Sequence, residues 1–296
     1  MIKKLLWSLV TITALTIGTF AVNTMTAVPP RAATGEFKQI QLDAVTLSYH
    51  ALKNGGPTIL LFPSAGRPAS DFNELVTALQ QAGYSTIAVE PRGMRDDSGL
   101  DSADTSLFDL ADDIAAITAN EGVEKHLLIG HAYGNRVVRA YATRHTSASL
   151  GVVLLAAGGS APIDPKYNAA LSKSFWTFMP DWWREGQIRS AFFAGDNPVP
   201  DYWMGGWSTQ AALLAGRTKL KPKAQEWLHA GGVPMLVVQA MQDKIAPPEH
   251  AARVIKTALG DRVEVVEIDN AGHAMLSEQP AQVHAAVIAF ANKHLR

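Results

Sequence analysis

Two side chains capable of acid–base chemistry each follow an apolar run in the C-terminal part of the sequence. Asp243 comes shortly after residues 235–239, and His273 comes shortly after residues 263–268. An imidazole that is hydrogen-bonded to a carboxylate is held in one tautomer and can work as a general base. If the fold brings Asp243 and His273 together, the pair can take a proton from a bound molecule or from water.

A third segment, residues 127–135, combines an apolar run with glycines at Gly130 and Gly134. The pattern predicts a buried strand that turns sharply into a helix, because the glycines permit a tight approach of the backbone. The middle residue of this turn is Ala132. A methyl group cannot attack a carbonyl carbon, so no acyl-enzyme can form at this position.

The strands and helices that position these residues are predicted from alternating apolar runs and amphipathic segments. The runs predict strands at 37–42, 45–50, 58–62, 86–89, 125–129, 150–155, 235–239 and 263–268. The amphipathic segments predict helices at 70–83, 106–120, 133–144, 249–259 and 281–293. Strands that alternate with helices form a mostly parallel sheet covered on both faces, so the predicted fold class is α/β.

Between residues 160 and 231 this alternation stops and aromatic residues concentrate. Six of the seven tryptophans of the chain lie in this range. We interpret 160–231 as a helical cap inserted into a core made of residues 37–159 and 232–296. Such a cap would cover the carboxyl ends of the strands, where ligands bind in sheets of this kind. The side chains expected to bind substrate are Trp176, Trp182, Trp183, Trp203 and Trp207.

The N-terminal segment has the pattern of a secretory signal peptide. Lys3 and Lys4 precede an apolar stretch over residues 5–22, and cleavage after Ala21 or Ala27 fits the small residues there. An uncleaved anchor helix is the alternative. We therefore expect a signal peptide at 1–27, a linker at 28–36, and a protein that is periplasmic or secreted.

Composition excludes several classes of function. The chain has 296 residues, a net charge of −1 and no cysteine. The near-neutral charge gives no basis for binding nucleic acid or an anionic membrane surface. Without cysteine there is no disulfide, thiol nucleophile or thiolate metal site, and no nucleotide-binding glycine motif occurs. We expect no metal and no cofactor. The expected partner is a small apolar substrate or ligand, and the oligomeric state stays open.

The order of Gly130–Gly134, Asp243 and His273 along the chain resembles the α/β-hydrolase superfamily, in which nucleophile, acid and histidine follow one another in this order. The chain looks like the lid-bearing lipase, esterase and lactonase branch. The form Gly-His-Ala-aromatic-Gly-Asn also resembles a bacterial subgroup that carries alanine at the nucleophile position, which favours a natural alanine over an engineered one. The resemblance implies an α/β-hydrolase fold with an inserted helical cap.

The resemblance also implies roles for particular residues. His273 and Asp243 become the catalytic pair, and Ala132 occupies the vacant nucleophile position. The backbone N–H groups of Ser64 and Tyr133 become the donors of an oxyanion hole. His131 is expected to pack beside the turn, because its slot points away from the substrate in the family.

Three functions remain open from the sequence. In the first, a hydrolase acts on an apolar ester or lactone, and His273, aligned by Asp243, activates water because serine is absent. In the second, the same pair is the base of a non-hydrolytic enzyme, either a lyase or a cofactor-free oxygenase. In the third, the protein is a catalytically inactive ligand-binding pseudoenzyme.

Overall fold

The computed structural model describes residues 31–43, 45–95, 104–158 and 161–295. The segment expected to be a signal peptide, residues 1–27, lies outside the described residues, as do residues 28–30 of the expected linker. None of the helices in the described ranges has the length and apolar character needed to span a bilayer.

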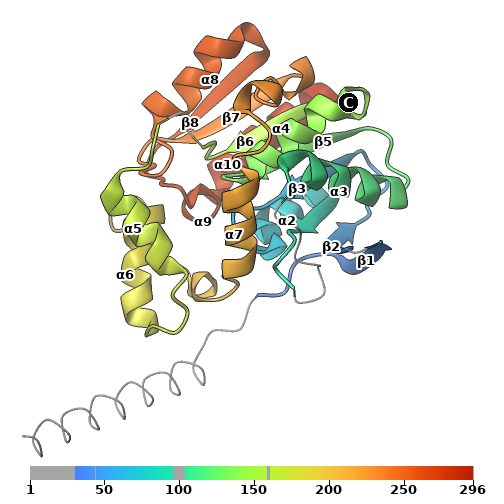
Figure 1. Ribbon diagram of the computed structural model, residues 1–296. Helices are drawn as coiled ribbons and strands as arrows, with labels where there is room; N and C mark the ends of the chain where they lie inside the picture. The colour runs from blue at the N-terminus through green and yellow to red at the C-terminus, as the bar shows by residue number, and fades with distance from the viewer. Residues whose placement is uncertain (1–30, 44, 96–103, 159–160, 296) are drawn as a thin grey trace, which may run out of the picture.

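A twisted sheet forms the centre of the protein (Figure 1). Within the described residues it has eight strands in the order β1-β2-β4-β3-β5-β6-β7-β8. The strands are β1 (Glu36–Leu42), β2 (Val45–Leu52), β3 (Thr58–Phe62), β4 (Ser85–Glu90), β5 (His126–His131), β6 (Ser149–Leu155), β7 (Met235–Ala240) and β8 (Val263–Ile268). β2 pairs antiparallel with β1 and with β4, and every other pair is parallel. The predicted α/β class with a mostly parallel sheet is confirmed.

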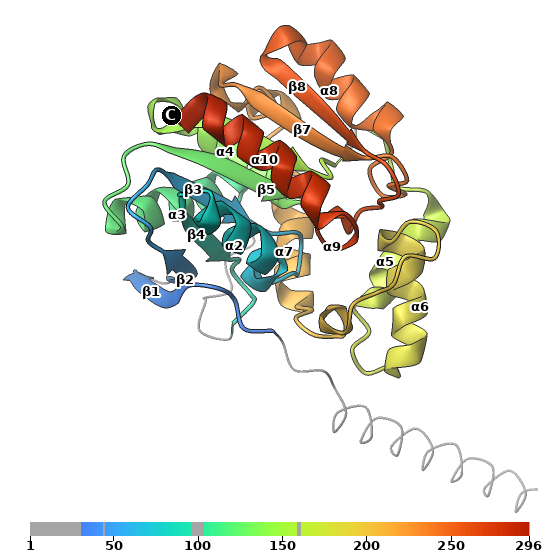
Figure 2. The ribbon, with the colours of Figure 1, turned by 180° about the vertical axis from the view of Figure 1, so that it is seen from behind.

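Helices cover both faces of this sheet (Figures 1 and 2). One face carries α3 (Leu107–Asn120), α4 (Gly134–Arg144) and α8 (Ala252–Leu259), and the other carries α2 (Asn73–Gln81) and α10 (Pro280–Leu295). The alternation along β5 shows why both faces need cover. Leu128 packs in one core with Val137 of α4, whereas Leu127 and Ile129 pack in the other with Val287 of α10. Every residue of β5 is buried, as in a strand enclosed on both sides.

The segment expected to form one helix at 70–83 is divided in two. A short 3-10 helix covers Ala69–Phe72 and α2 follows from Asn73 to Gln81. Phe72 separates them with φ −96° and ψ 4°, outside helical geometry, and its side chain is fully buried. Burial of this aromatic ring therefore outweighs the continuous helical periodicity of the sequence.

Three helices form the cap: α5 (Pro165–Ser174), α6 (Asp181–Phe192) and α7 (Thr209–Thr218). Their bounds fall within the expected insert at 160–231. The end of α6 is hydrogen-bonded to the loops that follow β7 and β8. The N–H of Ala274 donates to the carbonyl of Phe192 at 2.9 Å, and Lys244 Nζ donates to the carbonyl of Phe193 at 3.0 Å. The cap is thereby fixed at the carboxyl edge of the sheet.

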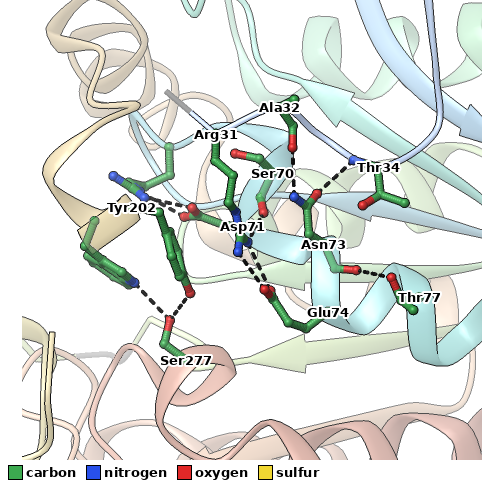
Figure 3. A network of polar contacts seen from close by, with 12 residues as sticks. Arg31, Ala32, Thr34, Ser70, Asp71, Asn73, Glu74, Thr77, Tyr202 and Ser277 are labelled. Carbon is green, nitrogen blue, oxygen red and sulfur yellow. Dashed lines mark hydrogen bonds and ion pairs between the residues drawn. The ribbon is translucent and has the colours of Figure 1, made fainter. Parts of the chain in front are cut away.

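Arg31 fastens the beginning of the described chain to this assembly (Figure 3). Its guanidinium donates to Glu74 Oε1 and to the carbonyl of Ser70, both at 2.6 Å. The same group lies 3.8 Å from the centre of the Tyr202 ring, whose hydroxyl is 2.6 Å from Ser277 Oγ. These contacts connect the N-terminal segment, α2, the cap and α9 (Met275–Glu278).

Candidate active site

Ala132 lies at a sharp turn between β5 and α4, and we call Gly130–Gly134 the elbow. Ala132 has φ +48°, in the left-handed region. Its N–H donates to the carbonyl of Leu155 at 2.9 Å, and its carbonyl accepts from the N–H of Asn135 at 3.2 Å. The left-handed conformation costs an alanine roughly 1–2 kcal/mol. The chain therefore keeps the strained backbone that presents a residue to the site, although the residue carries no nucleophile.

The two elbow glycines are required by close contacts. A Cβ on Gly130 would lie 2.5 Å from the backbone N of Asn135. A Cβ on Gly134 would overlap the carbonyl oxygen of Phe62, at the end of β3. The first turn of α4 is thus pressed against the loop after β3, which brings that loop and the elbow to one side of the site.

His273 and Asp243 form a buried hydrogen-bonded pair. Nδ1 of His273 lies 2.8 Å from Oδ2 of Asp243, and both residues are less than 5% exposed. The other carboxyl oxygen of Asp243 accepts from the N–H groups of Ile245 and Ala246, each at 2.8 Å. The loop after β7 thus holds one carboxyl oxygen, and the other is bound by His273.

This environment keeps Asp243 ionised. Burial by itself raises the pKa of the carboxyl group, but the neighbouring His273 and the two loop amides outweigh it and lower the pKa overall. An ionised carboxylate only accepts hydrogen bonds, so Nδ1 of His273 must carry the proton. Nε2 is then the basic nitrogen of the ring.

A cavity of about 500 Å³ brings the expected chemical groups together. It is lined by Ala132, His273, Ser64 and Tyr133, from the elbow and the loops after β3 and β8. The N–H groups of Ser64 and Tyr133 donate to no other described residue. Two unpaired amides beside the elbow fit the expectation of oxyanion donors from the resemblance.

The aromatic residues of the cap divide into two groups, and only one touches the cavity. Trp207 lines it, and its indole Nε1 donates to the carbonyl of Trp203 at 2.5 Å. Trp203 itself is 3% exposed, packs in the core of the cap and donates to Ser277 Oγ at 2.9 Å. Trp176 and Trp182 are 42% and 76% exposed, and Trp183 stacks on Trp176.

Trp176, Trp182, Trp183 and Trp203 do not line this cavity, so their expected role in substrate binding stays a prediction. Aromatic density along a sequence does not reveal which side of a helix faces inward. The aromatic rings at the cavity besides Trp207 are Phe175, Phe192 and the half-buried Tyr133. Sequence reasoning also missed three cations in the lining, Arg67, Arg136 and Lys219, because none belongs to a recognisable motif.

Arg67, in the loop after β3, lines the cavity and connects that loop to the cap. It forms a two-fold ion pair with Asp71, at 2.7 and 2.8 Å, and donates to the carbonyl of Gly205 at 2.9 Å. Its guanidinium lies close to the rings of both Trp203 and Trp207, 4.7 and 4.5 Å from their centres. The positive charge of this cavity residue is thus neutralised within the protein.

The fold defines an α/β hydrolase, with alanine at the centre of the elbow. A family model described as Hydrolase_4, serine aminopeptidase S33, matches residues 57–280. Because this match covers most of the chain, the protein belongs to that hydrolase family.

Individual relatives agree with this assignment. The AB hydrolase superfamily protein YisY of Bacillus subtilis is 24% identical over 264 residues, covering 84% of this chain and 96% of that protein. Human Protein ABHD8 is 23% identical over 224 residues, and the match spans 49% of its length.

Solved structures share the fold. A bacterial membrane phospholipase A superposes with a TM-score of 0.72 at 19% identity and covers 98% of both chains. A thermophilic esterase from Thermogutta terrifontis superposes with a TM-score of 0.71 at 19% identity, over 88% of this chain and all of the other. At these identities the likeness shows the fold alone.

Proposed function

We propose that this protein is an esterase- or lipase-type hydrolase in which water, activated by His273, attacks a bound ester or lactone directly. The observation that carries the proposal is the 2.8 Å hydrogen bond between His273 and Asp243 beside an elbow without a nucleophile. Several proteins with this fold are named as esterases, among them naproxen esterase of Bacillus subtilis.

The reaction would proceed in two steps. His273 Nε2 takes a proton from water while the water oxygen forms a bond to the carbonyl carbon. The N–H groups of Ser64 and Tyr133 stabilise the oxygen that becomes negative. The bond to the leaving oxygen then breaks, and the imidazolium returns the proton to that oxygen. Asp243 stabilises the imidazolium between the two steps, and no covalent intermediate forms.

The lining of the cavity supports an apolar substrate. Ile163, Leu171, Phe175, Phe192 and Ile245 contribute apolar surface around the polar groups of the elbow. A cavity with mostly apolar walls and a few convergent polar groups is typical of a small-molecule site.

The missing serine favours one alternative, a ligand-binding pseudoenzyme. The buried pair of His273 and Asp243 argues against a pseudoenzyme. An ionised carboxylate is costly to bury unless it is paired and hydrogen-bonded, and Asp243 receives three hydrogen bonds for which a simple binding protein has no evident need.

Turnover of an ester and lactone panel, followed by mass spectrometry in ¹⁸O-labelled water, tests the proposal. We expect one labelled oxygen in the acid product and loss of activity in His273→Ala by about 10²–10⁴-fold. His229→Ala, which replaces an exposed histidine, is the matched control and should retain activity. Wild-type protein without turnover on any member of the panel would support the pseudoenzyme instead.

A further inference from the structure

The charges around the cavity do not balance. The lining includes three cationic side chains, Arg67, Arg136 and Lys219, and no aspartate or glutamate among the described residues. Arg67 is neutralised by Asp71. Arg136 and Lys219 form no side-chain hydrogen bond or ion pair with any described residue. Two unpaired cations therefore face a largely apolar space.

Arg136 is held in place although it lacks a counter-charge. It lies one turn after Ala132 on α4, with its guanidinium carbon 5.5 Å from the centre of the Trp227 ring. Gly158, which follows β6, leaves room for it, since a Cβ there would lie 3.3 Å from Nη2 of Arg136. The guanidinium thus has an aromatic ring and a glycine beside it and room at the cavity.

A second arginine on the same helix increases the positive potential. Arg139 is 1% exposed, lies 4.7 Å from the centre of the Trp227 ring and donates to the carbonyl of Asn135 at 3.2 Å. No described carboxylate pairs with it. Positive charges that are buried or half-buried without a carboxylate beside them are costly, and a bound anion would relieve that cost.

We infer that the cavity accepts an amphiphilic anion, with an apolar body in the cavity and a carboxylate on Arg136. Lys219, the exposed residue directly after α7, adds attraction at the edge. A planar guanidinium matches the two oxygens of a carboxylate. One consequence rests on the proposed function. The ester or lactone that is hydrolysed carries an acid group remote from the bond that breaks.

Direct binding tests this inference without turnover. Decanoate and decanamide have similar apolar chains but differ in charge, and calorimetry can measure the binding of both. We expect decanoate to bind about tenfold more tightly than decanamide to wild-type protein. Arg136→Gln should remove that preference and leave decanamide binding within about twofold. Arg144→Gln, which replaces an exposed arginine at the end of the same helix, should change neither.

Two results would overturn the inference. One is equal binding of the two ligands, or no binding of decanoate, in wild-type protein, which needs no variant. The other is a preference for decanoate that survives in Arg136→Gln and disappears in His273→Ala, because the carboxylate would then bind at the catalytic pair. Charge-selective binding without turnover of any ester would refute the proposed hydrolysis but leave the anion site standing. Turnover of an ester together with equal binding of decanoate and decanamide would support the proposed hydrolysis and refute the anion site.

Discussion

Nε2 of His131 lies 3.0 Å from the carbonyl oxygen of His273 and donates a hydrogen bond to it. The last residue of β5 is thereby joined to the loop that carries His273, across the carboxyl edge of the sheet. His131 does not line the cavity, and its ring centre is 5.6 Å from that of His273. It therefore connects the elbow to the pair formed by His273 and Asp243.

Restoring a nucleophile should convert the site to covalent chemistry. Ala132→Ser places a hydroxyl on a backbone that already has φ +48°. We expect labelling by a fluorophosphonate, a burst of p-nitrophenol from p-nitrophenyl esters, and activity raised by roughly 10²-fold or more. Ala156→Ser is the matched control, since Ala156 has φ +47° but does not line the cavity. Absence of a label on Ala132→Ser would show that the elbow does not face His273.

Removing the charge of Asp243 should impair catalysis without disrupting the fold. Asp243→Asn keeps the shape of the side chain but no longer fixes the proton on Nδ1 of His273. We expect kcat to fall by about 10²–10⁴-fold with little change in KM, as when a triad loses its carboxylate. The exposed Asp269 precedes His273 in the same loop, so Asp269→Asn is the control and should retain kcat. Unchanged kcat in Asp243→Asn would contradict the role assigned to the pair.

Stability should decrease in mild acid because two histidines are buried in neutral form. Burial lowers the pKa of His126 and of His131 to about 4, with neighbouring histidines adding to the effect. The unfolded chain, with histidine pKa near 6.5, binds these protons first. The free energy of unfolding should therefore fall as pH drops from about 6.5 to 4, by up to ~1.4 kcal/mol per pH unit for each histidine.

Urea unfolding across this pH range checks the expectation. His126 is the better residue to replace, because neither ring nitrogen has a partner and its side chain is fully buried. His126→Leu should flatten the pH dependence, whereas the exposed His229→Leu should leave it unchanged. Equal slopes in wild type and His126→Leu would show that His126 does not contribute.

The glycines of the elbow and of the cap should respond in opposite directions to alanine. Gly134→Ala places a methyl against the carbonyl oxygen of Phe62, so we expect the protein to lose about 3 kcal/mol or more of stability or to fail to fold. Gly186 lies within α6 with no atom near the position of a Cβ. Gly186→Ala should stabilise the protein by about 0.5–1 kcal/mol. Thermal melts measure both, and a tolerated Gly134→Ala would contradict the close contact.

Much of the fold followed from local patterns. Apolar runs such as Thr58–Phe62 marked enclosed strands, and the residues after them marked the carboxyl edge. The pairing of Asp243 with His273 depended on a chain order that few folds share. The strands and the carboxyl edge can be predicted because each is carried by a short segment whose own residues dictate its conformation.

The residues that line the cavity could not be predicted from local sequence patterns. Trp176 and Trp207 are both cap tryptophans, yet one is exposed and the other lines the cavity. Arg136 resembles any surface arginine in the sequence and becomes a cavity cation only because the cap helix α7 lines the same cavity.

The sequence by itself therefore determined the α/β architecture, the elbow and the absence of a nucleophile, since these depend on residue type and periodicity. Only the tertiary structure decided which cap side chains face the cavity and which cations lack a partner. Those properties depend on how separate helices pack against one another, and local spacing carries no information about that packing.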